Sequence, residues 1–383
     1  MFRSVTTALA LVAGVGLALP LAASEGVTAD SVSFAQVAAL DGPAAALGLG
    51  MKQGMDAAFA EANAAGGVNG RKIVLDSFDD SYEPDQSAAE VSRLVSAGAH
   101  IGLIGLVGTP TTSATQPIAT AAGVPYIGPF TGAGFLRDAA LTNVLNVRAS
   151  YDAETEDWIR YLVDVKGMKN IAILYQDDGF GRVGLDGVTA ALERRGMTLT
   201  ATGTYTRNTT AVKSALIDIR AAAPDAVVMV GAYKPIAEFI RLSHKLDFAP
   251  TFVNISFVGS SALAGELGAD GEGVIVSQVV PFPWDKSLPV VAKYQAAMQA
   301  AQPDATFDFV SLEGYIVGRL AIEAVRAAGQ DLTRAGLLTA MKGLTSVDID
   351  GLQMGFGPGD NQGLEQVFLT QITADGSFAQ IVD

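Results

Sequence analysis

The chain has 383 residues, 40 of them Asp or Glu against 25 Lys or Arg, and carries a formal net charge of −15. Nucleic acid is a poor partner for so acidic a chain, because binding to the phosphate backbone depends on Lys and Arg. With no cysteine and only 2 histidines, His100 and His244, the chain can form no disulfide and has little material for a zinc site or a His-assisted nucleophile.

Residues 1–24 have the features of a secretory signal peptide. Arg3 supplies a positive charge, residues 8–19 form an uncharged apolar run, and small residues at 22–24 offer a cleavage site. The run is shorter than the about 20 apolar residues that span a bilayer, and no later segment is long and apolar enough. A lipoprotein anchor needs a cysteine, which the chain lacks. We expect a mature protein in a Gram-negative periplasm, without lipid anchor or membrane insertion.

Strands and helices are predicted to alternate over the first half of the chain. Short apolar runs indicate buried strands. Apolar residues at helical spacing, with proline at a first helical position and glycine after a last one, indicate helices. We predict strands at 32–37, 73–78, 101–106, 124–127 and 144–148, and helices at 48–64, 84–97 and 113–122.

The same alternation starts afresh after residue 150. We predict helices at 151–166, 184–195, 211–222 and 233–246, strands at 171–175, 198–205, 226–230, 251–254 and 273–279, two helices within 288–328, and short β-like segments over 351–382. Two batches of βαβ units, in a chain too long for one core, predict an α/β fold of two doubly wound parallel-sheet lobes.

Three crossings between the lobes are expected, near 148–150, 279–283 and 355–359, the last two where Pro and Gly interrupt the pattern. These crossings assign residues 25–148 and 280–355 to lobe 1, and residues 149–279 and 356–383 to lobe 2. A chain that crosses three times gives a hinged pair of lobes, with a cleft between the two sheets.

Two loops rich in glycine and threonine follow neighbouring predicted strands, at 108–113 and 131–134. The carboxyl ends of parallel strands meet at one edge of a sheet, where ligands bind in α/β folds. Free N–H groups at a helix N-terminus suit a carboxylate. For any single threonine, a role in a turn or a helix cap is a better explanation than a ligand site. Two such loops placed one strand apart favour a ligand site.

Five segments carry a resemblance to a known family: DGPAAALG at 41–48, NAAGGVNGRKIVL at 63–75, GTPTTSATQP at 108–117, GVPYIGPFTGA at 123–133 and VRASYDAETE at 147–156. Together they resemble the type I periplasmic binding proteins, within the leucine/isoleucine/valine-binding branch of ABC-transporter solute receptors. The resemblance covers the whole mature chain. It implies a non-enzymatic receptor without cofactor or metal, two lobes that close on a ligand, and an inner-membrane ABC permease as partner. We expect a monomer.

The resemblance also implies which residues line the site. In the family, the loops that match 109–113 and 131–133 hold the ligand carboxylate, and aromatic residues of the second lobe line the cleft. The predicted ligand-binding residues are Thr109, Thr111, Thr112, Thr131, Gly132, Tyr151, Phe180, Tyr233, Ser256 and Phe257.

Ser256 marks a departure from the family, whose amino-acid binders carry a glutamate there that pairs with the ligand ammonium. A buried ammonium without a counter-charge is costly. Asp152, Glu154 and Glu238 are the nearby acids that could stand in, and Glu154 is the best placed. An acid in the first turn of a helix is also a common match to the helix dipole, and we favour that explanation. We therefore expect neutral or aromatic carboxylates, or amides, to bind better than leucine or valine.

Other motifs are weaker. The GxGxxG at 179–184 is predicted to be a strand-to-helix turn, because Asp177 and Asp178 would repel a pyrophosphate. The acidic run at 76–85 lacks the spacing of an EF-hand and is predicted to be a solvated turn. Trp158 and Trp284 are predicted to be packing residues rather than ligand platforms, although Trp284 could line the cleft mouth.

The sequence thus predicts the solute-binding component of an ABC importer for a small carboxylate-bearing compound. A ligand-sensing receptor of the same fold is the alternative. A hydrolase or dehydrogenase on a doubly wound sheet is disfavoured by the missing catalytic residues, since neither a GxSxG elbow nor a P-loop occurs.

Overall fold

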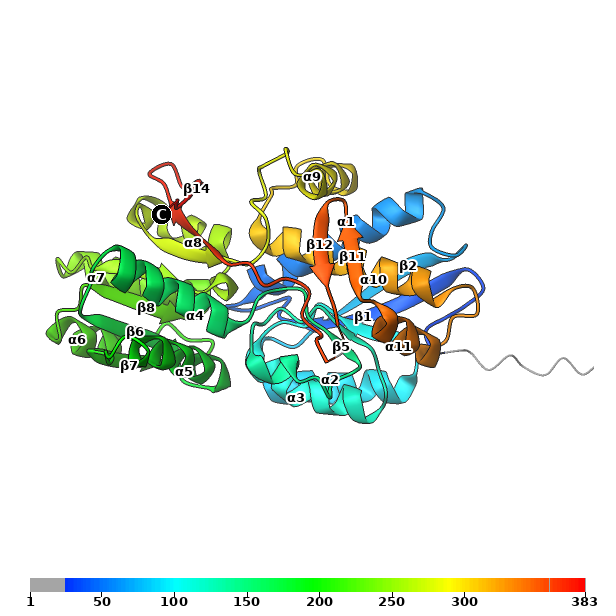
Figure 1. The fold of residues 1–383 in the computed structure, drawn as a ribbon, viewed down its shortest axis with the longest axis horizontal. Helices are drawn as coiled ribbons and strands as arrows, with labels where there is room; N and C mark the ends of the chain where they lie inside the picture. The colour runs from blue at the N-terminus through cyan, green and yellow to red at the C-terminus, as the bar shows by residue number, and fades with distance from the viewer. Residues whose placement is uncertain (1–24, 358, 383) are drawn as a thin grey trace, which may run out of the picture.

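Two lobes lie side by side in the computed structural model, which describes residues 25–357 and 359–382, each lobe with a sheet flanked by helices (Figure 1). The mixed α/β fold with mainly parallel sheets confirms the fold class. The predicted signal peptide lies outside the described residues. None of the described helices is long and apolar enough to cross a membrane.

The first lobe is built on a parallel sheet of order β2-β1-β3-β4-β5. Its strands are β1 Ser31–Ala38, β2 Lys72–Asp79, β3 Gly102–Ile104, β4 Tyr126–Ile127 and β5 Val144–Leu145. Its helices are α1 Ala45–Ala64, α2 Pro84–Ala97, α3 Thr109–Ala121, α9 Pro289–Ala301, α10 Phe309–Ala328 and α11 Arg334–Gly343. The pair α1 and α10 packs most closely, because Gly54 of α1 and Gly314 of α10 let the two backbones meet.

The second lobe is built on a sheet of order β14-β13-β10-β9-β8-β6-β7. Its parallel strands are β6 Ile171–Gln176, β7 Ala201–Tyr205, β8 Ala226–Val230, β9 Thr251–Asn254 and β10 Ile275–Gln278. Antiparallel β13 Phe368–Ile372 and β14 Phe378–Gln380 complete the sheet. Its helices are α4 Tyr151–Ile159, continued as a π-helix over Arg160–Val165, α5 Gly179–Glu193, α6 Lys213–Ala221, α7 Tyr233–Lys245 and α8 Ser260–Leu267.

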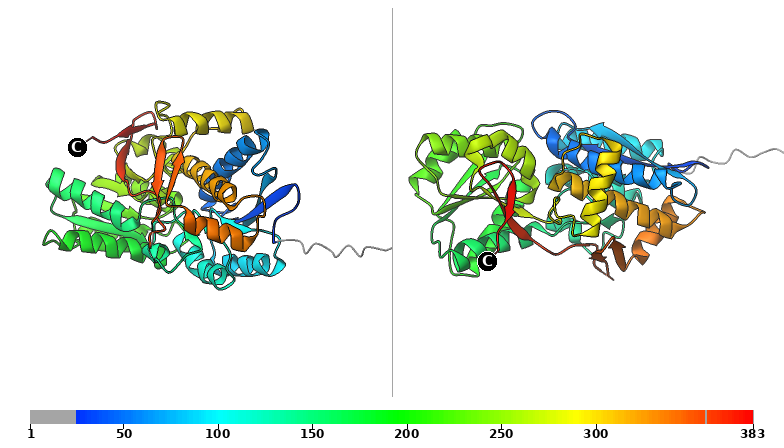
Figure 2. Two further views of the ribbon diagram at one scale, coloured as in Figure 1. Left: turned by 45° about the vertical axis from the view of Figure 1, so that its right-hand side comes forward. Right: turned by 90° about the horizontal axis from the view of Figure 1, so that it is seen from above.

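The chain passes between the lobes after β5, after β10 and after the two-stranded ribbon of β11 Ser346–Ile349 and β12 Leu352–Gly355 (Figures 1 and 2). The first and last passages run side by side. Asn146 N–H donates to the carbonyl of Asn361 at 2.7 Å, and Gly363 N–H donates to the carbonyl of Asn146 at 2.9 Å. The assignment of residues to lobes by cuts at 148, 279 and 355 stays a prediction.

Most predicted elements form, but some boundaries were predicted wrongly and two helices were not predicted. Helix α3 begins at Thr109 rather than at 113, because the Thr111 and Thr112 hydroxyls bond back to carbonyls of the preceding turn and so fit a helix. Helix α5 begins at Gly179 rather than at 184, because Asp178 caps it. The sequence analysis missed α8 and α11.

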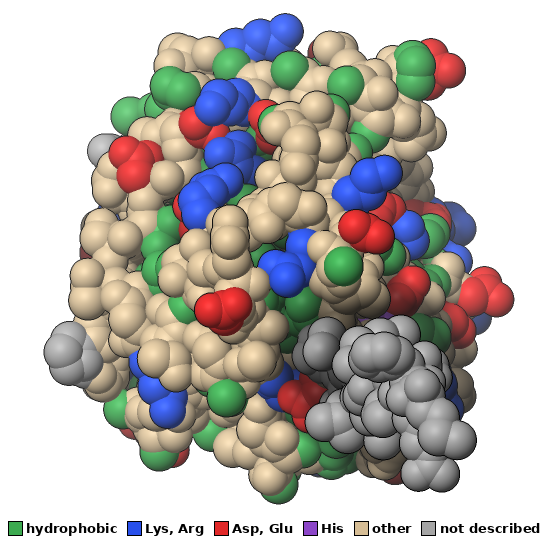
Figure 3. Space-filling view, turned by 90° about the vertical axis from the view of Figure 1, so that its right-hand side faces the viewer, with side chains coloured by type: hydrophobic (Ala, Val, Ile, Leu, Met, Phe, Trp, Pro, Cys, Tyr) green, Lys and Arg blue, Asp and Glu red, His purple; other side chains and the backbone are tan. Residues whose placement is uncertain are grey.

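On the face seen in Figure 3, Lys and Arg side chains lie among Asp and Glu side chains rather than in one basic patch. Exposed ion pairs elsewhere in the molecule include that between Arg182 and Asp177 at 3.3 Å. A mixed surface of this kind does not present the basic stripe that nucleic acid needs.

Candidate functional site

The two threonine loops meet at the carboxyl edge of the first sheet. Strands β3 and β4 are parallel neighbours, so the residues that follow them emerge at the same edge. The Thr109 and Thr131 hydroxyls are buried and lie 2.7 Å apart. Ala133 N–H donates to the Thr131 hydroxyl at 3.3 Å. Two hydroxyls and the N-terminus of α3 thus converge at this edge.

Tyr151, the first residue of α4, brings the second lobe to this point. Its N–H donates to the carbonyl of Gly132 at 2.8 Å. A Cβ at Gly132 would lie 2.5 Å from the Tyr151 ring, so only glycine permits this approach. The buried Tyr151 hydroxyl has no hydrogen-bond partner of good geometry among the described residues.

Burial raises the pKa of the Tyr151 phenol, while Arg148, the Thr131 hydroxyl and the Gly132 N–H act to lower it. The phenol therefore stays protonated and able to donate at neutral pH. Its neighbours include another hydroxyl and a backbone N–H, so the donors of both lobes converge on one small volume. Such a set suits a carboxylate, whose charge strengthens each hydrogen bond.

Thr111 and Thr112 have a different role from Thr109. The Thr111 hydroxyl donates to the carbonyls of Val107 and Gly108, and the Thr112 hydroxyl donates to the carbonyl of Gly108 at 2.7 Å. These bonds hold the first turn of α3 and use the hydroxyl protons within the helix. The structure therefore brings Thr109 and Thr131 together, and it turns Thr111 and Thr112 toward their own backbone.

A buried aromatic cluster joins the two lobes beside these donors. Phe257 is at its centre, with ring centroids 5.9 Å from Tyr82, 5.3 Å from Phe130 and 4.7 Å from Phe180, and Phe180 lies 5.6 Å from Tyr151. Phe180, Tyr151 and Phe257 were predicted. Tyr82 and Phe130 were missed. Both follow strands of the first sheet, which is the pattern that identified the threonines, so the same reasoning could have found them.

Tyr233 lies outside this ring-to-ring contact. Its hydroxyl accepts a hydrogen bond from Ala46 N–H at 3.4 Å, which links the start of α7 to the start of α1 across the lobes. A second link joins the two lobes: Arg207 and Asn208, which follow β7, donate to Glu83 at 2.8 and 2.7 Å.

Ser256 lies between a buried cation and a buried carboxylate. Arg148 makes a bidentate pair with Glu313, at 2.8 and 2.7 Å, and donates to the Ser256 hydroxyl at 3.0 Å. The Ser256 hydroxyl and N–H donate to Glu154 at 2.8 and 2.9 Å, and the Ser277 hydroxyl also donates to it. The chain of bonds runs from the first passage to both lobes.

Glu154 therefore does more than match the helix dipole, the explanation favoured from sequence. Its side chain is completely buried, and burial raises the pKa of its carboxyl group while the Arg148 charge and the serine donors lower it. Burial alone would lower the pKa of Arg148, but the Glu313 carboxylate raises it. Glu313 was also missed, because a single polar residue in a largely apolar helix does not indicate a partner.

The remaining motifs have structural roles. Asp178 accepts from Phe180 N–H at 2.9 Å, so the glycine-rich motif is a capped helix start, as predicted. Asp79 accepts from Leu40 N–H at 2.7 Å. Trp158 is buried, and Trp284 stacks on Phe378 away from the aromatic cluster. In the parts of the chain that are described, no three potential metal ligands gather.

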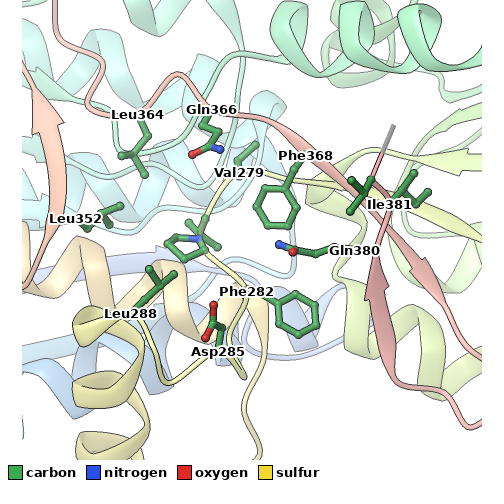
Figure 4. A pocket seen from close by; sticks show the side chains of 13 residues that line it. Val279, Phe282, Asp285, Leu288, Leu352, Leu364, Gln366, Phe368, Gln380 and Ile381 are labelled. Atoms are coloured by element: carbon green, nitrogen blue, oxygen red, sulfur yellow. The ribbon is translucent and has the colours of Figure 1, made fainter. Parts of the chain in front are cut away.

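A cavity of about 340 Å³ lies elsewhere, at the second and third passages (Figure 4). It is lined mainly by apolar side chains, among them Val279, Phe282, Leu288, Leu364, Phe368 and Ile381. A much smaller cavity, of about 10 Å³, adjoins Phe130, Arg148, Ser256 and Glu313. It borders one ring of the aromatic cluster and the buried ion pair, beside the converging donors rather than among them.

Comparison with known proteins agrees with this geometry. A family model described as periplasmic binding protein matches residues 31–377. A solved structure of a possible leucine/isoleucine/valine-binding protein from Rhodopirellula baltica SH 1 is 37% identical, with TM-score 0.88, covering 92% of this chain and 97% of that one.

Two further proteins are similar over most of the chain. A substrate-binding periplasmic protein from Ralstonia solanacearum is 26% identical, with TM-score 0.87, covering 92% of this chain and 100% of that one. The Leu/Ile/Val-binding protein homolog 7 of Brucella abortus (strain 2308) is 24% identical over 336 residues, 82% of each chain.

Proposed function

Because this chain belongs to the periplasmic binding protein family, we propose that it captures a small carboxylate-bearing solute between its lobes and delivers it to an inner-membrane ABC permease. One observation carries the ligand class: the hydroxyls of Thr109, Thr131 and Tyr151 converge with the Gly132 N–H. These donors come from both lobes, so an anion held by all of them favours the closed form, as a ligand with differential affinity must.

The aromatic cluster supports an apolar body for the solute. Tyr82 and Phe130 from the first lobe face Phe180 and Phe257 from the second, and all are buried. A ligand between the lobes would part these rings and replace their contacts with its own. Aliphatic or aromatic acids without a further charge fit such a wall best, because a charged group there would lose its hydration.

A specific observation favours a second candidate, a free amino acid. Glu154 places a buried carboxylate beside Ser256, where the family's amino-acid binders have their glutamate. Its oxygens already accept bonds from Ser256 and Ser277, which is why we place this candidate second. The names of the relatives, Leu/Ile/Val-binding proteins, also point to it.

A thermal-shift panel of matched compounds separates the two candidates. A ligand at about 100 times its Kd stabilises a protein by about 2.7 kcal/mol, which a melting curve detects. We expect 3-phenylpropanoate and 4-methylpentanoate to raise Tm more than phenylalanine and leucine, which differ by the amino group. The largest shift with leucine, isoleucine or valine would select the amino acid instead. An equal shift with 3-phenylpropanamide would contradict the carboxylate site.

Thr131→Val should weaken binding of the best acid in that panel by at least about tenfold, since a hydrogen bond to a charged group contributes about 1.5–3 kcal/mol. Thr115→Val is the matched control. It removes a buried hydroxyl from α3, which bonds to Tyr126 at 2.9 Å rather than to the site. Calorimetry that finds the same Kd for Thr131→Val as for the control would refute the role of Thr131.

A further inference from the structure

Arg137 lies directly behind the loop that the proposed function assigns to the carboxylate. It ends the short 3₁₀ turn Gly134–Arg137 that follows this loop. One of its terminal nitrogens, Nη1, donates to the carbonyls of Thr131 at 3.2 Å and Ala133 at 3.0 Å. The guanidinium thus binds the backbone of this loop at two carbonyl groups.

These two hydrogen bonds determine the direction in which the N–H groups of the loop point. In a trans peptide the C=O and the following N–H face opposite ways. With the carbonyls of Thr131 and Ala133 turned to Arg137, the N–H groups of Gly132 and Gly134 are turned away from it. The Gly132 N–H is the one that lies beside the Tyr151 hydroxyl. The orientation of the anion-binding N–H therefore depends on Arg137.

The other donors of Arg137 reach the passages between the lobes. Nη2 donates to the carbonyl of Arg148 at 2.9 Å and to that of Ala149 at 3.4 Å. Nε donates to the side-chain oxygen of Gln362 at 2.6 Å. One side chain thus connects the loop with the first and the third passage.

Among the described residues, the charge of Arg137 has no carboxylate partner. All the acceptors that it bonds in the described part of the chain are uncharged. Burial, with help from the like charge of Arg148, lowers the pKa of Arg137 to about 10, so the group is still protonated at neutral pH. The acids that act on it are Glu313, which is paired with Arg148, and Glu365, which is exposed.

We propose that Arg137 is a positioning residue for the carboxylate of the ligand, holding the loop 131–133 with the Gly132 N–H toward the anion and supplying a positive charge behind it. This inference rests on the proposed carboxylate site and goes beyond it, because Arg137 need not touch the ligand. A partly buried charge of this kind is screened less by salt than a fully exposed one.

Acetate, the smallest simple probe with a methyl group, tests the proposal, with acetamide as its neutral match. Amide NMR resonances of Gly132 and Ala133 report binding at the loop itself. At constant ionic strength we expect Arg137→Gln to raise the Kd of acetate by about tenfold and to leave that of acetamide unchanged. Arg137→Lys, which keeps the charge, should recover most of the affinity. Arg93→Gln removes a charge from the exposed ion pair with Glu90 and should change neither Kd.

The outcomes separate the carboxylate site from the role of Arg137. If acetate leaves the loop resonances of the wild type unmoved, the carboxylate site of the proposed function is wrong. If acetate binds the wild type and Arg137→Gln equally, the role of Arg137 is wrong and the proposed function stands. If Arg137→Lys loses as much affinity as Arg137→Gln, with the same drop in Tm, Arg137 is structural and the charge has no part.

Discussion

Glu313→Gln is expected to lower the free energy of unfolding by about 3–5 kcal/mol, because it leaves the buried Arg148 cation without its counter-charge. The pair is almost fully buried, with exposed fractions of 1% and 2% for the two side chains. A glutamine keeps the shape and one acceptor oxygen, but it cannot compensate the charge. Urea denaturation followed by circular dichroism measures the loss.

The double variant Arg148→Met with Glu313→Leu is the control for this prediction. Removing both charges leaves neither uncompensated, and apolar replacement of a buried ion pair is often neutral or stabilising. The double variant should therefore unfold at a higher urea concentration than Glu313→Gln. If the two variants are equally unstable, the cost comes from lost packing in the polar network rather than from the unpaired charge.

Gly54→Ala is expected to destabilise the first lobe by about 3 kcal/mol or more, at or beyond the upper end of overpacking effects. The added Cβ would lie 1.9 Å from the carbonyl oxygen of Ser311 and 2.5 Å from the nitrogen of Tyr315. Both are backbone atoms of α10, so only a separation of α1 from α10 removes the clash. That separation would expose apolar surface of the core along both helices.

Gly265→Ala is the matched control within another helix. A Cβ at Gly265, in α8, meets nothing within 4 Å. The substitution should stabilise the protein by up to about 1 kcal/mol, the difference in helix propensity between Ala and Gly. Thermal denaturation compares the two variants. A Tm for Gly54→Ala within a degree of the wild type would show that the two helices can part without cost.

The sequence was informative where a local pattern decides structure. Alternating apolar runs located the strands, and Thr109 and Thr131 were placed together because parallel neighbours end at one sheet edge. Contacts between distant segments had no such pattern. The pairing of Arg148 with Glu313 joins residues 165 apart, and nothing near either residue indicates the other.

The boundary of α3 illustrates the remaining errors. Threonine and proline read as loop residues, yet both are acceptable in a first helical turn, where proline needs no donor and a hydroxyl can bond back. Arg137 was overlooked for another reason. Its acceptors are backbone carbonyls, and a carbonyl is present at every position, so the sequence gives no sign of which ones a side chain will bind.

The closeness of α1 and α10 also bears on the order in which the protein can form. Tyr315 donates to Glu61, which was synthesised 254 residues earlier. At a synthesis rate of about 5–20 residues per second, α10 is made tens of seconds after α1. The second sheet is also completed late, because β13, which pairs with β10, lies near the end of the chain. Neither lobe can therefore complete its core until most of the chain has been synthesised.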